Sequence, residues 1–182
     1  MKSKYSASIK HDAHTIELLY KTQYYAYDKL RIIARFIIGF ALIAAALFMS
    51  LPIWARGILL LTGTWLMSSS DFPAQVRADK VIQSRHNNFP EMHYEFHEGY
   101  FTVSGEGSMN ISYDKVSRLI YDSEYLYIFM SRDSVCMIDS HTLTDKDAFM
   151  KFIGSVTGHE WRKEKPLLSM NIDDLKQIMK GA

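Results

Sequence analysis

The longest apolar stretch of the chain runs from Phe36 to Ser70 and holds one ionisable residue among its 35 positions. About twenty apolar residues in a helix are enough to cross the roughly 30 Å hydrocarbon core of a bilayer. A single straight helix of this length would extend about 52 Å, too long for one crossing even with tilt. Ser50-Leu51-Pro52 provides a break, because proline does not continue a helix that it interrupts. The pattern therefore predicts two spans, at about 32–50 and 53–70.

Other interpretations of this stretch agree less well with the sequence. A secretory signal peptide carries its apolar part near the start of the chain, whereas this run begins only at Phe36. Helices that are apolar on every side also occur in the cores of large soluble proteins, but a chain of 182 residues could hardly cover two of them. A single span would leave residues 57–70 outside the bilayer as a bare apolar segment.

The charges around the two predicted spans indicate their orientation. The turn carries only Arg56, two residues after Trp54, whose indole favours the membrane interface. Basic residues flank both spans: Lys21, Lys29, Arg31 and Arg35 before them, and Arg77, Lys80 and Arg85 after them. Basic flanks resist translocation, so both termini are expected in the cytoplasm. Small residues should let the two helices touch, and these are Gly39, Ala41, Ala44, Ala45, Ala46, Gly57, Thr62 and Gly63.

The segments on either side of the spans have helical and strand patterns of their own. Alternation from Tyr5 to Ile9 predicts a short strand, and Asp12 can cap the start of a helix that continues unbroken into the first span. Residues 74–85 predict a short connecting helix after the spans. Asn87-Asn88-Phe89-Pro90 then interrupts the pattern and marks a domain boundary.

From Glu91 onward the hydrophobic period changes to two. Short strands are predicted at 91–97, 101–104, 109–113, 117–122, 125–130 and 135–139. Such close and regular spacing indicates an antiparallel sheet or a small barrel. Thr144, with Asp147 three residues later, resembles a capping box at the start of a helix that closes the open side of the sheet. The expected core includes Tyr94, Phe96, Phe101, Leu126, Ile128 and Phe152.

The predicted fold class is an α+β membrane protein, in which a two-helix transmembrane hairpin carries a small antiparallel β-sheet or barrel closed by a helix. Its expected parts are an N-terminal strand and amphipathic helix at 1–31, the hairpin at 32–70, a connecting helix and linker at 71–90, a cytoplasmic β-rich domain at 91–157, and a tail at 158–182 with a short helix at Asp173–Met179.

Composition narrows the possible functions by exclusion. Lys and Arg total 21 against 20 for Asp and Glu, whereas a nucleic-acid-binding protein normally shows a strongly basic face. The only cysteine, Cys136, excludes an internal disulfide and any site built from several cysteines. The expected partners are therefore the lipid bilayer and either a protein or anionic lipid headgroups, with no nucleic acid.

No motif in the chain predicts catalysis, a cofactor or a metal. His93, Glu95 and His97 share one face of a strand and have the residue types of zinc ligands, but no fourth ligand is indicated and the solvent-exposed face of an outer strand explains them better. Asp139-Ser140-His141 has the residue types of a hydrolase triad at adjacent positions, where the side chains do not converge. Gly105-Glu106-Gly107 has the context of a hairpin turn, without the strand and helix of a phosphate loop. Cys136 lies in a strand that is apolar on both faces, so it should be buried.

The order of the predicted elements resembles the YcxB-like family of bacterial membrane proteins. The stretches that carry the resemblance are EFHEGYFTVSGEGSMNISYDKVSRLIYDSEYLYIFMSRDSVCMID and TDKDAFMKFIG, within residues 5–157. The resemblance implies a fold of the pleckstrin-homology (PH) type for the β-rich domain, location in the bacterial inner membrane, and no catalytic residues to transfer. The expected function is non-enzymatic: a cytoplasmic domain presented at the membrane for protein or lipid interaction. The alternative is a membrane-tethered enzyme whose site is assembled from residues distant in sequence.

Overall fold

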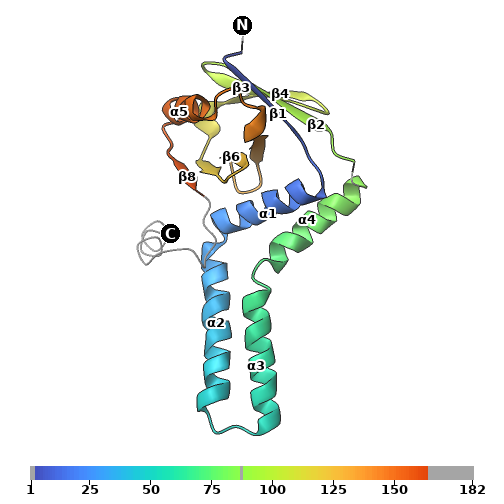
Figure 1. The fold of residues 1–182 in the computed structure, drawn as a ribbon, viewed down its shortest axis with the longest axis vertical. Coiled ribbons are helices and arrows are strands. Elements are labelled where there is room, and N and C mark those ends of the chain that lie inside the picture. The colour runs from blue at the N-terminus through green and yellow to red at the C-terminus, as the bar shows by residue number, and fades with distance from the viewer. Residues whose placement is uncertain (1–2, 87, 164–182) are drawn as a thin grey trace.

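Two long antiparallel helices project from a β-rich head in the computed structural model, which describes residues 3–86 and 88–163 (Figure 1). The projecting helices are α2 (Lys29–Phe48) and α3 (Ile53–Ser68), and the break between them falls at Pro52, as predicted. Two further helices, α1 (Ala13–Tyr27) and α4 (Phe72–Arg85), connect this hairpin to the head. The short helix expected at Asp173–Met179 lies outside the described residues.

Close approach of the two backbones holds α2 against α3. A Cβ atom added to Gly39 would lie 3.0 Å from the Gly63 carbonyl oxygen, and one added to Gly63 would lie 2.8 Å from the Gly39 oxygen. The contact between small residues is therefore present at these two glycines. Gly57 is different: its Cβ position meets nothing within 4 Å, so this glycine does not serve the contact.

Helix α1 begins where the sequence predicts it and ends earlier. The Asp12 carboxylate accepts a hydrogen bond of 2.7 Å from the Thr15 backbone N–H, and the Thr15 hydroxyl oxygen accepts one of 2.7 Å from the Asp12 N–H. The prediction that this helix runs unbroken into the first span was wrong. The backbone leaves the helical conformation at Asp28, so α1 lies across the base of the head while α2 turns away from it (Figure 1).

Two four-stranded sheets form the head. The first is antiparallel in the order β1 (Tyr5–Lys10), β2 (Glu91–Phe96), β3 (Tyr100–Ser104) and β4 (Ser108–Ser112). The second has the order β7 (Val135–Asp139), β6 (Tyr125–Phe129), β5 (Arg118–Tyr121) and β8 (Trp161–Lys163). β1 pairs with β2 along its whole length, from Tyr5 opposite Phe96 to Lys10 opposite Glu91. The hairpin is thus an insertion between two neighbouring strands of the first sheet.

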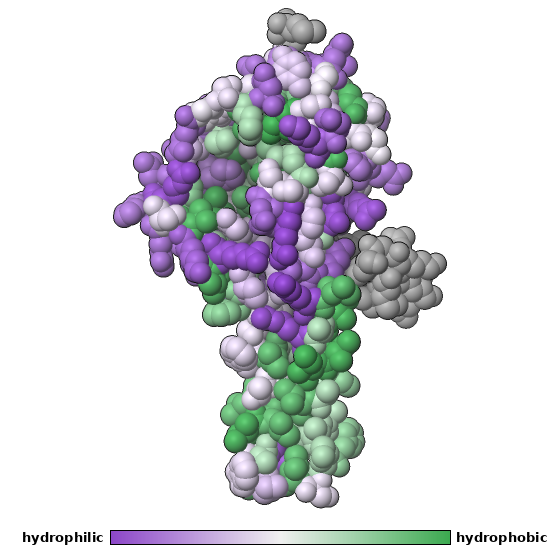
Figure 2. Space-filling model, turned by 180° about the vertical axis from the view of Figure 1, so that it is seen from behind, coloured by the Kyte–Doolittle hydropathy of each residue, from purple (hydrophilic) through white to green (hydrophobic). Residues whose placement is uncertain are grey.

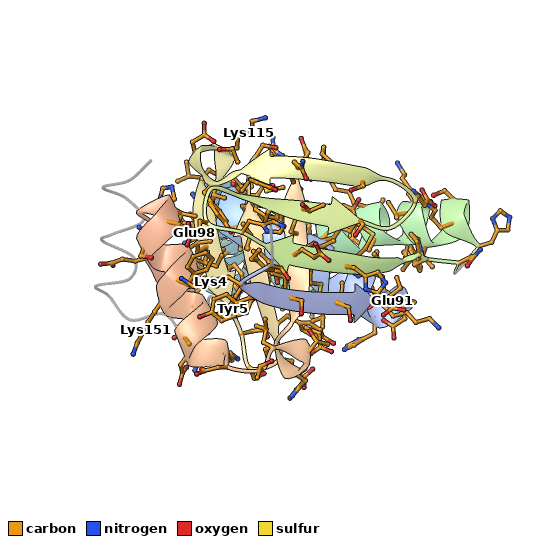
Figure 3. All side chains as sticks on the ribbon, turned by 90° about the horizontal axis from the view of Figure 1, so that it is seen from above. Lys4, Tyr5, Glu91, Glu98, Lys115 and Lys151 are labelled. Atoms are coloured by element: carbon orange, nitrogen blue, oxygen red, sulfur yellow. The ribbon has the colours of Figure 1, made fainter. Side chains whose placement is uncertain are left out.

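Helix α5 (Lys146–Thr157) covers one end of the two sheets. Its cap is Asp145, whose carboxylate accepts from the Ala148 N–H at 2.9 Å, and not Thr144 as the sequence suggested. Phe149 is fully buried and its ring meets that of Phe96 edge-on, with 4.7 Å between the centroids. Seen from above, α5 crosses the strands at the end where Tyr5 and Glu98 lie, and Glu91 marks the opposite end (Figure 3).

The buried core agrees with the sequence at five of six positions. Tyr94, Phe96, Phe101, Leu126 and Ile128 are all buried. Phe152 is only partly buried, because it lies on the flank of α5, where Lys4 stands over its ring at 4.7 Å from the centroid. Strand β8 was not predicted. It pairs in parallel with β5, and the Trp161 indole N–H donates to the Met150 carbonyl at 2.8 Å.

A buried carboxylate, Asp28, joins the helices to the head at the corner between α1 and α2. It is 5% exposed and forms two ion pairs. Its Oδ2 atom lies 2.5 Å from Nη2 of Arg132, and its Oδ1 atom lies 3.4 Å from Nη1 of Arg31. Arg132 lies in the turn between β6 and β7, whose backbone carbonyl also accepts from the Gln23 side chain. Arg118 on β5 donates to the carbonyl of Ala26 and stands 4.5 Å over the Tyr27 ring. The second sheet therefore fixes the direction in which α2 leaves α1.

Replacing Ile128 with alanine is expected to cost about 2–5 kcal/mol of the free energy of unfolding, because a fully buried side chain is lost and a cavity remains. Denaturant unfolding of the full chain in detergent, followed by near-UV circular dichroism, measures the loss. Ile82→Ala, at a partly exposed position on α4, is the control and should lose less. Equal losses for the two variants would contradict the assigned register of β6.

Arg132→Met is expected to lower the free energy of unfolding by about 1–3 kcal/mol, because it removes the closest partner of a buried carboxylate. Asp28→Asn should lose less, since no buried charge remains. The double variant should match Asp28→Asn alone, and this non-additivity identifies the pair. Arg162→Met, at an exposed position, is the control. Additive losses in the double variant would exclude the ion pair as the source of the effect.

Candidate functional site

The structure brings together two of the three residues considered as zinc ligands, since His97 Nε2 lies 3.9 Å from a carboxylate oxygen of Glu95, but the three differ in exposure. His93 and Glu95 lie on the exposed face of the first sheet, while Tyr94 and Phe96 point into the core. The alternation predicted His97 on the same exposed face, but β2 ends at Phe96 and His97 is buried. Its backbone N–H instead donates a hydrogen bond of 2.9 Å to the Tyr100 carbonyl, which closes the turn between β2 and β3. Within the described part of the chain, no group of three or more His, Cys, Asp or Glu side chains could hold a metal ion.

The Asp139-Ser140-His141 segment forms a short turn of 3-10 helix. The Asp139 carboxylate accepts from the backbone N–H of His141 at 2.9 Å, so it caps the turn. Ser140 is buried and its backbone N–H donates to the Glu124 carbonyl at 2.9 Å. The Asp139 carboxylate therefore stabilises the turn locally. Gly105-Glu106-Gly107 is the turn between β3 and β4, as predicted, closed by the Gly105 N–H on the Gly107 carbonyl at 2.9 Å.

Several of the basic residues that flank the hairpin have carboxylate partners. Lys21 on α1 pairs with Asp71 at 2.9 Å, and the Tyr25 hydroxyl donates to the same carboxylate. These hydrogen bonds and the lysine charge outweigh the effect of burial, and the pKa of Asp71 is lowered. The start of α4 is thereby fixed to the middle of α1. Arg85, at the other end of α4, pairs with Glu106 in the turn between β3 and β4.

A cavity of about 370 Å³ lies at the end of the sheets opposite α5. The inner faces of β2, β3 and β4 form its roof, the turn between β6 and β7 forms one wall, and α1 and α4 cover it from below. Its lining is mostly apolar, with three flexible methionines among the residues that surround it: Leu19, Val81, Met92, Val103, Met109 and Met130. A volume of this size falls within the range of small-molecule sites in proteins.

The titratable groups on the cavity wall are mainly uncharged. Burial raises the pKa of the Cys136 thiol to about 12, so it stays protonated at neutral pH. Burial also lowers the pKa of His11, and the nearby Asp12 carboxylate opposes that effect only in part. The Nδ1 atom of His11 is buried without a hydrogen-bond partner. Arg85 is the cationic side chain of the lining, and its guanidinium lies against Glu106. This arrangement is suited to binding an apolar molecule.

Sequence reasoning correctly placed Cys136 inside the head and did not find the cavity. The lining comes from six parts of the chain, namely α1, α4, β2, β3, β4 and the β6–β7 turn, and most of its positions follow an ordinary core pattern. Met92 and Met109 carried the only available signal, because they continue the apolar alternation of β2 and β4 toward the end that α5 does not cover.

Comparison with known proteins supports the family resemblance and adds no specific relative. The model of the YcxB-like protein family matches residues 97–153, the segment from the turn after β2 to the last part of α5. This match confirms the resemblance over that segment. No curated protein and no solved structure matches the chain.

Native Cys136 is expected to react with a water-soluble aromatic disulfide about a hundredfold more slowly than an exposed thiol, because burial raises its pKa and restricts access. The absorbance of the released thiolate gives the rate in detergent solution. The matched control is Ser134→Cys in a Cys136→Ser background, since Ser134 is exposed two residues away. Denaturation should make the two rates similar. Equal rates in the native state would place Cys136 at the surface.

Proposed function

We propose that this protein is a multi-pass protein of the bacterial inner membrane whose α2–α3 hairpin crosses the bilayer. The observation that carries the proposal is the exposure of large apolar side chains along the projecting helices. Phe48 and Ile53 are 87% and 88% exposed, and Leu61 is 75% exposed. Figure 2 shows the hairpin as a hydrophobic column beneath a largely hydrophilic head. Exposed apolar surface on this scale indicates contact with lipid or with another protein.

The lengths of the two helices fit a bilayer unequally. In the described part of the chain, α2 alone is long and apolar enough by itself to qualify as a span. At about 1.5 Å per residue, its 20 residues extend about 30 Å, and the 16 residues of α3 extend about 24 Å. Slight thinning of the bilayer accommodates such a difference at a modest energetic cost. The close pairing of α3 with α2 supports a shared crossing.

The distribution of charge favours one orientation of the hairpin. Arg56 is the only basic residue between Phe36 and Ser70, and its guanidinium donates to the Met49 carbonyl at 3.3 Å, across the turn. The basic residues on α1, on α4 and at the start of α2 lie at the opposite end of the hairpin, next to the head (Figure 1). Because basic flanks are retained on the cytoplasmic side, we place the head and both termini in the cytoplasm.

We propose further that the head is a domain of the pleckstrin-homology type that binds a partner without catalysing a reaction. The succession of a four-stranded sheet, a second sheet and a closing helix supports this assignment. The apolar lining of the cavity and the protonated Cys136 favour a binding domain over an enzyme, because catalysis generally requires convergent polar groups. The partner is a protein or a lipid, and its recognition takes place close to the membrane surface.

Cysteine labelling tests the topology. In a Cys136→Ser background, a cysteine at Ser50 is expected to react with an impermeant thiol reagent in intact spheroplasts, because it lies in the turn outside the cell. A cysteine at Ser134 should react only after lysis. Both serines are exposed, so access within the folded protein is matched. Labelling at position 134 in intact spheroplasts would place the head outside the cell and contradict the proposed topology.

A further inference from the structure

The cavity at the end of the head opposite α5 has the features of a ligand site for an amphiphile. α5 fills the other end of the two sheets with Phe149 and Ile153, which are both fully buried. At the cavity end, α1 and α4 span the opening and leave about 370 Å³ between them and the strands. The space is partly open to solvent and mostly apolar in its lining, as small-molecule sites in proteins commonly are.

The charged side chain on the lining, Arg85, lies at the edge of the cavity, where the lining meets the surface of the protein. Arg85 lies in the last turn of α4, and its guanidinium pairs with Glu106 in the turn between β3 and β4. Both side chains are about half exposed, at 48% and 62%, so the pair lies at the surface of the protein. Met109 lies three residues after Glu106, lines the same cavity and is itself 61% exposed. We call these three residues the rim of the cavity: Arg85 is its cation, Glu106 its carboxylate and Met109 its apolar edge.

We propose that this cavity binds a free single-chain amphiphile with an anionic headgroup, such as a long-chain fatty acid. The hydrocarbon chain lies among the apolar side chains of α1, α4 and the first sheet, and the headgroup carboxylate replaces Glu106 at Arg85. His11, whose buried Nδ1 has no partner, offers a second polar contact on the lining. This inference rests on the proposed function as a binding protein and names the class of ligand.

Two observations favour a free monoacyl ligand over a phospholipid that remains in the bilayer. The cavity volume is near the lower end of the roughly 300–1,000 Å³ that small-molecule sites occupy, which fits one acyl chain better than two. Arg85 is also 13 residues beyond Phe72, which begins α4 next to the hairpin. At about 1.5 Å per residue this distance is about 20 Å along α4, which runs obliquely away from the hairpin, so Arg85 lies at the end of the helix remote from the membrane-spanning segment (Figure 1).

Photo-crosslinking tests the site in the full chain reconstituted into lipid nanodiscs. The probe is a sixteen-carbon fatty acid with a diazirine near its methyl end, and peptide mass spectrometry locates the adducts. We expect adducts on residues that line the cavity, such as Met92, Val103 and Met130, in addition to any adducts on the hairpin. Val81→Trp should abolish the cavity adducts by filling the space. Val76→Trp, on the same helix and away from the cavity, should retain them.

Changes at the rim test the headgroup contact separately. Arg85→Gln should reduce the cavity adducts about tenfold, because a hydrogen bond to a charged group is lost. Arg77→Gln, at an exposed position on the same helix, should have no effect. Glu106→Gln should increase the adducts, since the competing carboxylate is removed. The methyl ester of the probe should be insensitive to Arg85→Gln. Thermal unfolding of each variant verifies that the fold is retained.

Three results would overturn the inference: adducts confined to the hairpin in the wild-type protein, equal cavity labelling in Val81→Trp, or equal cavity labelling by a diazirine-bearing phosphatidylglycerol. The last result would identify a bilayer lipid as the occupant. Co-flotation of the protein with liposomes measures membrane anchoring independently. Failure of flotation with cavity labelling retained would contradict the proposed membrane function alone, and flotation without cavity labelling would contradict only the ligand.

Discussion

The ion pair between Asp28 and Arg132 decides how the apolar hairpin and the β-rich head are connected. A buried carboxylate is stable only if cationic or hydrogen-bonding partners reach it, and this requirement is directional. Arg132 reaches Asp28 from the turn between β6 and β7, and Arg31 reaches it from the first turn of α2. An apolar contact at the same corner would tolerate several angles between α1 and α2. The charged contact selects one of them.

The direction of α1 in turn creates the space beneath the head. α1 lies across the open end of the sheets, and the pairing of Lys21 and Tyr25 with Asp71 brings the start of α4 alongside it. From there α4 runs to Arg85, which is fixed to the turn between β3 and β4 by Glu106. Both helices are therefore fixed by polar contacts at their ends. Their middle parts span the cavity without filling it, whereas α5 packs its aromatic face directly into the other end.

Insertion of the hairpin between β1 and β2 explains why the head remains intact around it. The two strands pair from Tyr5–Phe96 to Lys10–Glu91, so the points where the chain leaves and re-enters the sheet lie side by side. The helical segments between them return to nearly the same place, because α2 and α3 are antiparallel and α1 contacts α4. The strand pairing thus closes a loop of some 80 residues (11–90) that contains the whole hairpin. The position of the hairpin and the folding of the head are physically coupled through this closure.

The amino-acid sequence by itself determined the helical hairpin, the short strands and the buried side chains, because each depends on the periodicity of neighbouring residues. Pro52 separates α2 from α3 because proline interrupts a helix whatever surrounds it. The alternation at Tyr94 and Phe96 decides which face of β2 is buried in the core. The break at Asp28, the burial of His97 and strand β8 depended on tertiary contacts. No local pattern ends α1 at Tyr27; the partner that stabilises the corner, Arg132, is 104 residues away.

The cavity, like the break at Asp28, depends on tertiary contacts and is not recorded in any local sequence pattern. Its lining residues come from six parts of the chain, and the way in which α1 and α4 lie against the strands leaves the space between them empty. Packing density depends on how the elements are assembled, so the sequence of a single segment does not predict where a space is left. The sequence determined which residues are apolar and which segments are helices or strands. The tertiary structure alone decided where those apolar residues meet each other and where they enclose a site.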